Sequence, residues 1–247
     1  MPEQVGPAAA NPAAASAPAS GSAAASAPAP GSPAASSPAQ RGWADLDPTN
    51  DFVVAPPDAV ERCDELLRER GVTFRAAELP LRQGPKGAFV CGAPDAVVYT
   101  RGPTGMRLSP PATMTCRMAL ALADVEELVQ ELAQRELGKK VVRLTHVGTY
   151  NCRKMVRFDY VSEHSYGNAI DLSEFQLEDG RRVNVAKHFG VLDQQPPDAR
   201  SRFLRALGEQ AFARDLVSVS LGPYWDKAHR DHFHIDMARY RVDGSHP

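Results

Sequence analysis

The residues best suited to chemistry in this chain lie in two histidine-containing segments that are far apart in the sequence. The first, residues 162–171, holds His164 and Asp171 seven positions apart. A tight turn at Gly167, followed by a strand over 169–172, would bring the imidazole and the carboxylate toward one point. An imidazole nitrogen and a carboxylate oxygen are both common zinc ligands. The alternative is an exposed loop histidine beside a capping aspartate.

The second segment, residues 229–236, contains three of the seven histidines within six positions. In a strand, His232 and His234 share one face because side chains alternate with a period of two. Phe233 and Ile235 then face the core. Such a strand would place one or two imidazoles where the first segment can meet them. The alternative is a solvated charged edge with chance histidines, which this alternation of apolar and polar residues does not favour.

The elements that must position these segments follow from the spacing of apolar residues. Helical spacing predicts a helix over 58–70 between Asp58 and Gly71, a long helix over 115–137 ended by Gly138, and a third over 203–213. Further patterns predict strands over 71–80, 141–151 and 216–221, two strands within 87–100 around a turn at 92–95, and a loop over 101–111. Without regular βαβ spacing, this order predicts an α+β fold, with a mainly antiparallel sheet flanked by helices.

Composition excludes two classes of function. The 247 residues include 28 Lys and Arg against 30 Asp and Glu, for a net charge of −2. Without a basic excess, we expect no nucleic-acid partner. No apolar run approaches the length of about 18 residues that a membrane span needs, so none is predicted.

The first part of the chain differs sharply from the rest. Residues 1–41 are almost entirely Ala, Pro, Ser and Gly, and their only charges are Glu3 and Arg41. A segment with so few large apolar side chains cannot offset its conformational entropy, so we predict a disordered tail or linker over 1–41. Residues 42–247 are predicted to form one domain. The first 20 residues lack the basic and apolar regions of a secretory signal. Three possibilities remain: a start further upstream, a signal already removed, or a cytosolic protein.

Four cysteines occur, at positions 63, 91, 116 and 152, and none belongs to a C-x-x-C pair. A structural zinc ribbon or a thioredoxin-type site is therefore not expected. An even number at wide spacing suits two disulfides in any of three connectivities, and the alternative is four buried thiols.

Taken together, these motifs resemble those of the bacterial extensin-like C-terminal domain family. More widely, S-x-H-x-x-G-x-A-x-D over 162–171 and H-x-x-H-x-H over 229–234 resemble the LAS zinc metallopeptidases. That group takes in D-alanyl-D-alanine carboxypeptidases, penicillin-insensitive endopeptidases, lysostaphin-type enzymes and the hedgehog domain. Shorter matches occur at 149–153, 179–181, 203–204 and 221–223, and the resemblance spans about Asp58 to Tyr240. It implies a LAS- or hedgehog-like domain.

The resemblance implies one zinc ion held by His164, Asp171 and His234, with the fourth position left to water. It also implies that Asp231 is the general base. His232 and His229 match the non-ligand histidines that would orient this water or stabilise an oxyanion.

Weaker expectations concern Arg153 and Ser162. Arg153 could hold a substrate carboxylate through its planar guanidinium, although an ordinary surface arginine is the alternative. Ser162 occupies the position of a small hydroxyl that bonds groups around the metal. By resemblance alone, Cys63 is expected to pair with Cys91, and Cys116 with Cys152.

Two functions remain open on this basis. The first is a zinc-dependent hydrolase of the D,D-carboxypeptidase or endopeptidase type, acting on D-Ala-containing peptides of cell-wall peptidoglycan. The second is a non-catalytic, zinc-containing domain for binding or signalling in the cell envelope. In either case we expect a monomer in the periplasm or outside the cell.

Overall fold

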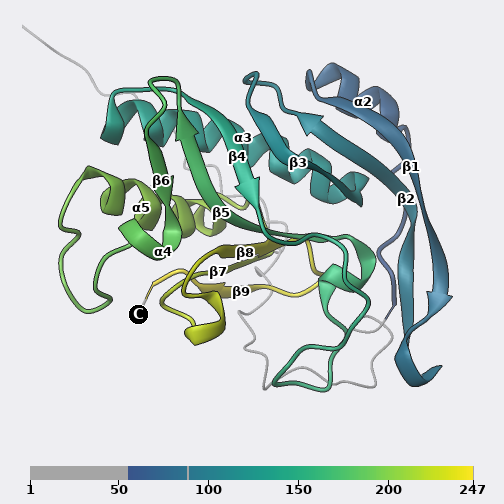
Figure 1. Cartoon of the computed structure of the whole chain (residues 1–247). Coiled ribbons are helices and arrows are strands. Elements are labelled where there is room, and N and C mark those ends of the chain that lie inside the picture. The colour runs from purple at the N-terminus through teal and green to yellow at the C-terminus, as the bar shows by residue number, and fades with distance from the viewer. Residues whose placement is uncertain (1–54, 88, 247) are drawn as a thin grey trace, which may run out of the picture. The chain divides into compact units, whose positions relative to one another are not determined.

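One mixed sheet, with two helices side by side against one of its faces, organises the chain (Figure 1). The computed structural model describes residues 55–87 and 89–246. Neighbouring strands follow the order β1-β2-β3-β4-β5-β8-β7-β9, and β6 pairs with β5. The predicted tail, residues 1–41, and its boundary with a domain from 42 onward lie outside the described residues, so that prediction stays open.

Along the described part of the chain, helices and strands follow one another without a regular repeat. The α-helices are α2 (Cys63–Glu69), α3 (Cys116–Leu137), α4 (Val185–His188) and α5 (Ala199–Ala213). The strands are β1 (Thr73–Gln83), β2 (Val90–Arg101), β3 (Arg107–Thr115), β4 (Val141–His146), β5 (Ala169–Leu177), β6 (Arg182–Asn184), β7 (Val219–Leu221), β8 (Phe233–Asp236) and β9 (Val242–Gly244). Three short 3-10 turns are η2 (Pro85–Gly87), η3 (Glu163–Tyr166) and η4 (Lys227–His229).

The sheet is mixed. β3 runs parallel to β4, and β7 runs parallel to β9. The other strand pairs are antiparallel. The first parallel pair is possible because α3 provides the crossover that parallel neighbours need. The α+β class is thus confirmed, and the predicted mainly antiparallel sheet is refined to a mixed one.

The long helix α3 forms as the sequence predicts. Thr115 caps its first turn by accepting a hydrogen bond from the Met118 amide (3.1 Å), and Gly138 ends it in the left-handed conformation with φ 64°. Its apolar stripe, including Leu122 and Val129, is fully buried against the sheet and α5. Most of the stability of this helix therefore comes from the burial of one face.

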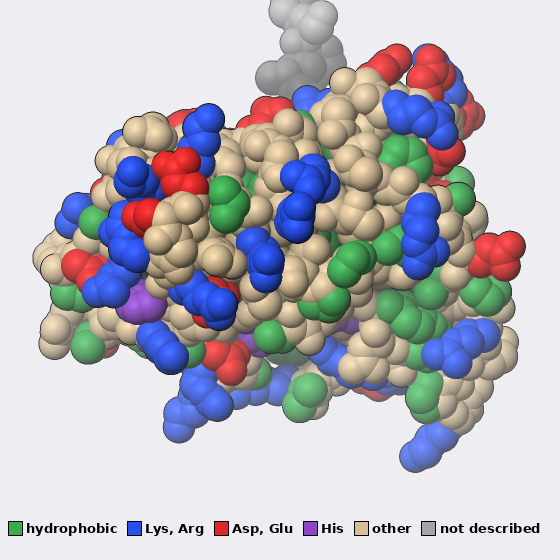
Figure 2. Space-filling model, turned by 45° about the horizontal axis from the view of Figure 1, so that its top comes forward, with side chains coloured by type: hydrophobic (Ala, Val, Ile, Leu, Met, Phe, Trp, Pro, Cys, Tyr) green, Lys and Arg blue, Asp and Glu red, His purple; other side chains and the backbone are tan. Residues whose placement is uncertain are grey.

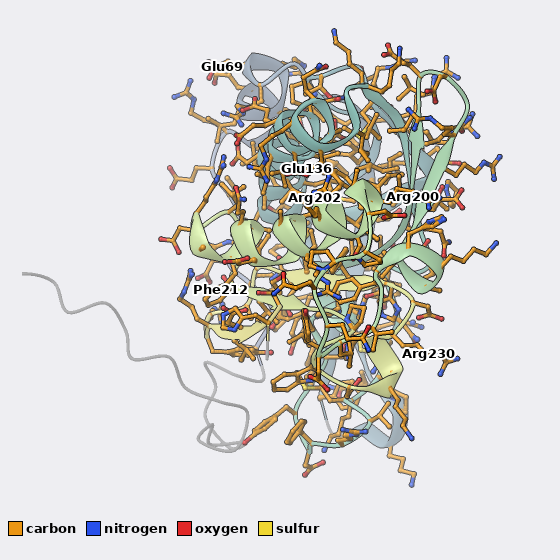
Figure 3. The ribbon with its side chains drawn as sticks, turned by 90° about the vertical axis from the view of Figure 1, so that its left-hand side faces the viewer. Glu69, Glu136, Arg200, Arg202, Phe212 and Arg230 are labelled. Carbon is orange, nitrogen blue, oxygen red and sulfur yellow. A yellow bond between two sulfur atoms is a disulfide. The ribbon has the colours of Figure 1, made fainter. Side chains whose placement is uncertain are left out.

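α5 lies beside α3 and completes the layer of helices. Arg202 of α5 donates to Glu136 of α3 across 2.8 Å, and Figure 3 shows these two side chains meeting between the helices. On its buried face, the ring of Phe203 packs edge-on against Phe175 of β5 at 5.2 Å. α5 thereby packs against β5 and stabilises the strand that carries one candidate metal ligand.

Two predictions between residues 87 and 111 are wrong. Residues 90–101 form the single strand β2 rather than two strands around a turn. Gly92 instead lies at an irregularity in the β1–β2 pairing, where the Pro80 backbone approaches too closely for any side chain. The predicted loop 101–111 contains the first half of β3. Pro110 and Pro111 are tolerated because β3 bonds β4 only through 107–109 and resumes regular pairing with β2 at 112.

The remaining predicted elements exist with shifted ends. Asp58 does not cap the first helix, because α2 begins only at Cys63 and the Asp58 side chain is exposed. Gly71 does follow α2 in the left-handed conformation, with φ 74°. Elsewhere, β1 lies at 73–83 rather than 71–80, β4 ends at 146 rather than 151, α5 begins at 199 rather than 203, and β7 begins at 219 rather than 216.

Both disulfides form, but the pairing implied by the resemblance is wrong. Cys63 is bonded to Cys116, and Cys91 to Cys152. The first pair forms because α2 packs beside α3, which places the two helices' first residues 5.9 Å apart at their Cα atoms. The second joins β2 to the loop that precedes η3, with Cα atoms 5.7 Å apart. The first bond therefore holds α2 against α3, and the second holds the loop before η3 against β2.

Among the described residues, no helix is both long and apolar enough to cross a bilayer.

Candidate metal centre

The two histidine-containing segments predicted to meet do meet, on neighbouring strands of the sheet. β5 and β8 pair antiparallel, and their register places Asp171 directly opposite His234. His164 comes from η3, just before β5. Gly167 reverses the chain between them with φ 68°, and its carbonyl accepts from the Thr115 amide at the start of α3 (2.9 Å). The predicted turn at Gly167 is therefore confirmed and is fastened to the long helix.

Three ligand atoms converge at this point. The Nε2 atom of His164 lies 3.2 Å from Oδ1 of Asp171 and 3.1 Å from Nδ1 of His234, and the last two atoms are 3.1 Å apart. The triangle is nearly equilateral. Tetrahedral zinc with ligand bonds of about 2.0 to 2.1 Å needs donors roughly 3.3 Å apart, so the triangle has the dimensions of a zinc site. The three residues predicted as ligands form one of two groups with metal-binding geometry among the described residues; the other contains Cys63 and Cys116, which are bonded to each other.

Each imidazole is held in the orientation that a metal ligand requires. His164 donates from Nδ1 to the carbonyl of Thr149 (2.6 Å), so its Nε2 lone pair faces the triangle. His234 donates from Nε2 to Oδ2 of the buried Asp236 (2.9 Å), so its Nδ1 lone pair faces the same point. Such outer partners fix the tautomer and raise the basicity of a metal-binding histidine.

The charges at the triangle favour a cation. Burial alone would raise the pKa of Asp171, but hydrogen bonds with His164 and His234 outweigh it and hold this pKa well below its usual range. Burial also lowers the pKa of His234, but bonds to Asp171 and Asp236 outweigh it and raise that pKa to about 10. The buried Asp236 and the largely enclosed Asp171 thus favour positive charge between them, which a proton or a metal ion can supply.

The backbone at Gly148 lies close to the carboxylate of Asp171. A Cβ on Gly148 would lie 2.8 Å from Oδ2 of Asp171. The same segment binds the Asp171 backbone, since the Asp171 amide donates to the Gly148 carbonyl (3.0 Å). Sequence reasoning missed this glycine. The only available signal was its position within the strand predicted over 141–151.

A second missed group is a buried polar network behind His164. Asn168 donates to Oε2 of Glu163 (2.7 Å) and accepts from the Thr115 hydroxyl (2.9 Å). Burial, together with the nearby charge of Asp236, raises the pKa of Glu163 to about 8. The network ties η3 to Thr115, the residue that caps α3, and so holds the turn that carries His164. Both Glu163 and Asn168 stand within the 162–171 motif, which was their only signal.

The two remaining motif histidines stand beside the triangle, each backed by an aspartate. His232 donates from Nδ1 to Asp231 (2.8 Å), and its Nε2 lies 3.7 Å from Oδ1 of Asp171. His229 donates from Nδ1 to Asp226 (2.8 Å). Burial lowers the pKa of His229 more than its bond to Asp226 raises it. Its ring lies 5.3 Å from that of His232, so the two imidazoles form one cluster.

Asp231, predicted as the general base, is not beside the ligand atoms. Its side chain is 50% exposed, and its Oδ1 accepts from Nδ1 of His232, whereas the other ring nitrogen of His232 is the one near Asp171. Asp231 therefore reaches the triangle only through that histidine. By contrast, Asp226, which was not predicted, lines the pocket and also pairs with Arg157 at 3.3 Å.

The three residues of the triangle line an open pocket of about 250 Å³. Predicted residues Arg153 and Ser162 both line it. Arg153 is anchored through its backbone, whose amide and carbonyl both bond to the Ser165 hydroxyl (2.9 and 2.7 Å). Apolar side chains form much of the remaining wall: Met155, Val156, Phe158, Leu221 and Trp225. The pocket thus combines a cationic group with an apolar wall above the candidate metal centre.

Most of the chain is similar to a known protein family. The family described as "Extensin-like protein C-terminus" matches residues 61–245, which is most of the chain. No curated protein and no solved structure matches the chain.

Proposed function

We propose a function from the geometry of the site for this chain, which belongs to the family of extensin-like protein C-terminal domains. We propose that the protein is a zinc-dependent hydrolase of the LAS type that cleaves D-Ala-containing peptides of cell-wall peptidoglycan. One observation carries the proposal: His164, Asp171 and His234 form a triangle with edges of 3.1 to 3.2 Å in the wall of an open pocket.

The residues present fit zinc. Two imidazole nitrogens and one carboxylate oxygen form the donor set, and both imidazoles are oriented by outer partners. Three protein ligands leave a position open toward the pocket, as catalytic zinc sites do. When bound, zinc would act as a Lewis acid and would lower the pKa of a coordinated water to about 7.

His232 is best placed to move the proton of the attacking water. Since its Nδ1 is occupied by Asp231, its Nε2 carries the free lone pair and faces the triangle. Proton transfer by a positioned imidazole typically contributes 10²- to 10⁴-fold to a rate. Asp231 then acts as a positioning residue that holds this tautomer, a role different from the direct base expected from the sequence.

His229 and Arg153 complete the proposed machinery. Both line the pocket. The Nε2 atom of His229, left free by the bond to Asp226, is available to hydrogen-bond the oxygen of a scissile carbonyl. The Arg153 guanidinium can pair with a carboxylate of the substrate, such as the end of a stem peptide. Ser162 is almost fully buried, so it supports the pocket floor.

The two disulfides support a proposal for the cellular setting. Both cysteine pairs are oxidised, and such bonds persist mainly in oxidising compartments. We propose that the protein acts in the periplasm or outside the cell, where peptidoglycan is accessible.

The test is digestion of purified muropeptides by the zinc-loaded protein, with and without a chelator, analysed by mass spectrometry. Loss of one D-Ala from stem peptides indicates a carboxypeptidase, whereas conversion of crosslinked dimers to monomers indicates an endopeptidase. Either reaction should stop with chelator and return with added zinc. The matched controls are His232→Ala, which should lose turnover but retain zinc, and His188→Ala, which removes a histidine of α4 outside the pocket. Unchanged muropeptides in the presence of bound zinc would refute the hydrolase and leave the envelope-binding domain.

A further inference from the structure

Three arginines stand in one row across adjacent strands, remote from the metal pocket. Arg101 of β2 is the register partner of Arg107 of β3, which is in turn the partner of Arg143 of β4. All three line one surface hollow, so their side chains emerge on the same face of the sheet. Like charges placed directly opposite on neighbouring strands destabilise a sheet. The row therefore costs stability unless something with negative charge offsets it.

The described residues do not provide that charge. Arg101 donates only to the backbone carbonyl of Gly105 (3.1 Å), and within the described ranges no ion pair involves any of the three arginines. On β5 the register partner of Arg143 is Gln176, which carries no charge. Glu174, two residues before it on β5, is paired with Arg182 at 3.3 Å. Figure 2 shows basic side chains in the middle of the molecular face standing apart from acidic ones, whereas the left-hand edge mixes both.

The shape of the surface narrows the choice of anion. The arginines line a hollow of about 430 Å³, whose wall also includes Thr73 and Ser109. Adjacent strands are about 4.8 Å apart, so the row is roughly 10 Å wide. A guanidinium binds phosphate oxygens through two parallel hydrogen bonds. The lining contains no aromatic side chain on which a base could stack, which argues against single-stranded nucleic acid.

We propose that this hollow is a binding site for a diphosphate group. Two linked phosphates carry about three negative charges near neutral pH, which matches the three arginines, and their oxygens can accept from more than one guanidinium group. The proposal does not depend on the proposed hydrolase, because the residues that line this hollow are all different from those of the metal pocket. The diphosphate could belong to a soluble compound or to the head group of a lipid carrier.

The binding test uses calorimetric titration of the full chain with inorganic pyrophosphate, and with orthophosphate for comparison. We expect pyrophosphate to bind at least tenfold more tightly than orthophosphate. The variant Arg107→Gln/Arg143→Gln should weaken pyrophosphate binding at least tenfold. The control is Arg75→Gln, an exposed arginine of β1 outside the row, which should bind as the unaltered protein does. Pyrophosphate can also bind zinc and remove it from the protein. That effect would be the same in all variants, so a difference between variants reports binding at the arginine row.

Two further measurements separate the source of the ligand and guard against misfolding. Binding to vesicles containing a diphosphate-linked lipid, but not to vesicles with a monophosphate lipid, would assign the site to a lipid carrier; binding of the soluble diphosphate alone would assign it to a soluble compound. In the absence of ligand, the Tm of the Arg107→Gln variant should be no lower than that of the unaltered protein, because the substitution relieves repulsion between the arginines. Equal pyrophosphate binding by the double variant and by Arg75→Gln would overturn the proposal, as would an absence of binding.

Discussion

Replacement of Asp236 by Asn tests whether the outer partner of His234 supports metal binding. Asp236 is 1% exposed and uses both oxygens: Oδ2 accepts from Nε2 of His234 (2.9 Å), and Oδ1 accepts from the Ala238 amide (3.0 Å). Asn offers only one acceptor oxygen, so its amide group must face one of these two donors. One buried donor is left unsatisfied, at a cost of about 1 to 3 kcal/mol.

If the variant leaves the His234 bond unmade, the ring loses its fixed tautomer and part of its basicity. Loss of such an outer partner typically weakens metal affinity 10- to 100-fold, or about 1.4 to 2.7 kcal/mol. The assay is competition for zinc against a chromophoric chelator at fixed pH. The matched control is Asp231→Asn, which alters the aspartate bonded to the non-ligand His232 and should leave zinc affinity within about twofold while lowering turnover. An Asp236→Asn affinity equal to that of the unaltered protein would refute the reasoning.

Three further predictions follow from other parts of the fold. Gly148→Ala should weaken zinc binding, measured by the same competition, because its Cβ would lie 2.8 Å from Oδ2 of Asp171; unchanged affinity would contradict the close approach. Cys63→Ser/Cys116→Ser opens a loop of 53 residues and should lower the free energy of unfolding by about 4 kcal/mol on the chain-entropy account, measured in urea; a loss below 1 kcal/mol would contradict it. Glu126 is buried, which raises its pKa from 4.5 to about 8, so the folded state holds the proton more tightly than the unfolded state does. Its stabilising contribution is complete below pH 4.5 and is lost as the pH rises through 8, at no more than about 1.4 kcal/mol per pH unit. Glu126→Gln should therefore gain stability relative to the unaltered protein between pH 5 and pH 8 in urea titrations, and parallel profiles would refute this assignment.

Short-range patterns predicted that His164, Asp171 and a histidine of residues 229–234 would meet, and the family resemblance singled out His234 among those histidines. The alternation of Phe233, His234 and Ile235 places the imidazole on one face and two apolar side chains in the core, where both are now found. The turn at Gly167 required a residue that tolerates positive φ. Each of these constraints acts over a few residues and can be read without knowledge of the fold.

The features that the sequence did not reveal depend on contacts between distant segments. The disulfide pairing follows from α2 lying beside α3, which no local pattern specifies. β3 was assigned to a loop because Pro110 and Pro111 usually mark turns, and only the gap in its pairing explains their presence. The distance of Asp231 from the triangle likewise depends on where β8 begins, at Phe233, two residues after Asp231.

The most direct test of the central claim is the zinc content of the purified protein after dialysis against a buffer with micromolar free zinc. The account predicts one zinc per chain for the unaltered protein and for Asp231→Asn, and none for Asp171→Ala or His234→Ala. Circular dichroism of each variant confirms that the fold is retained. An unaltered protein without zinc, or a His234→Ala variant that keeps it while Asp231→Asn loses it, would contradict the assignment of His164, Asp171 and His234 as the metal ligands.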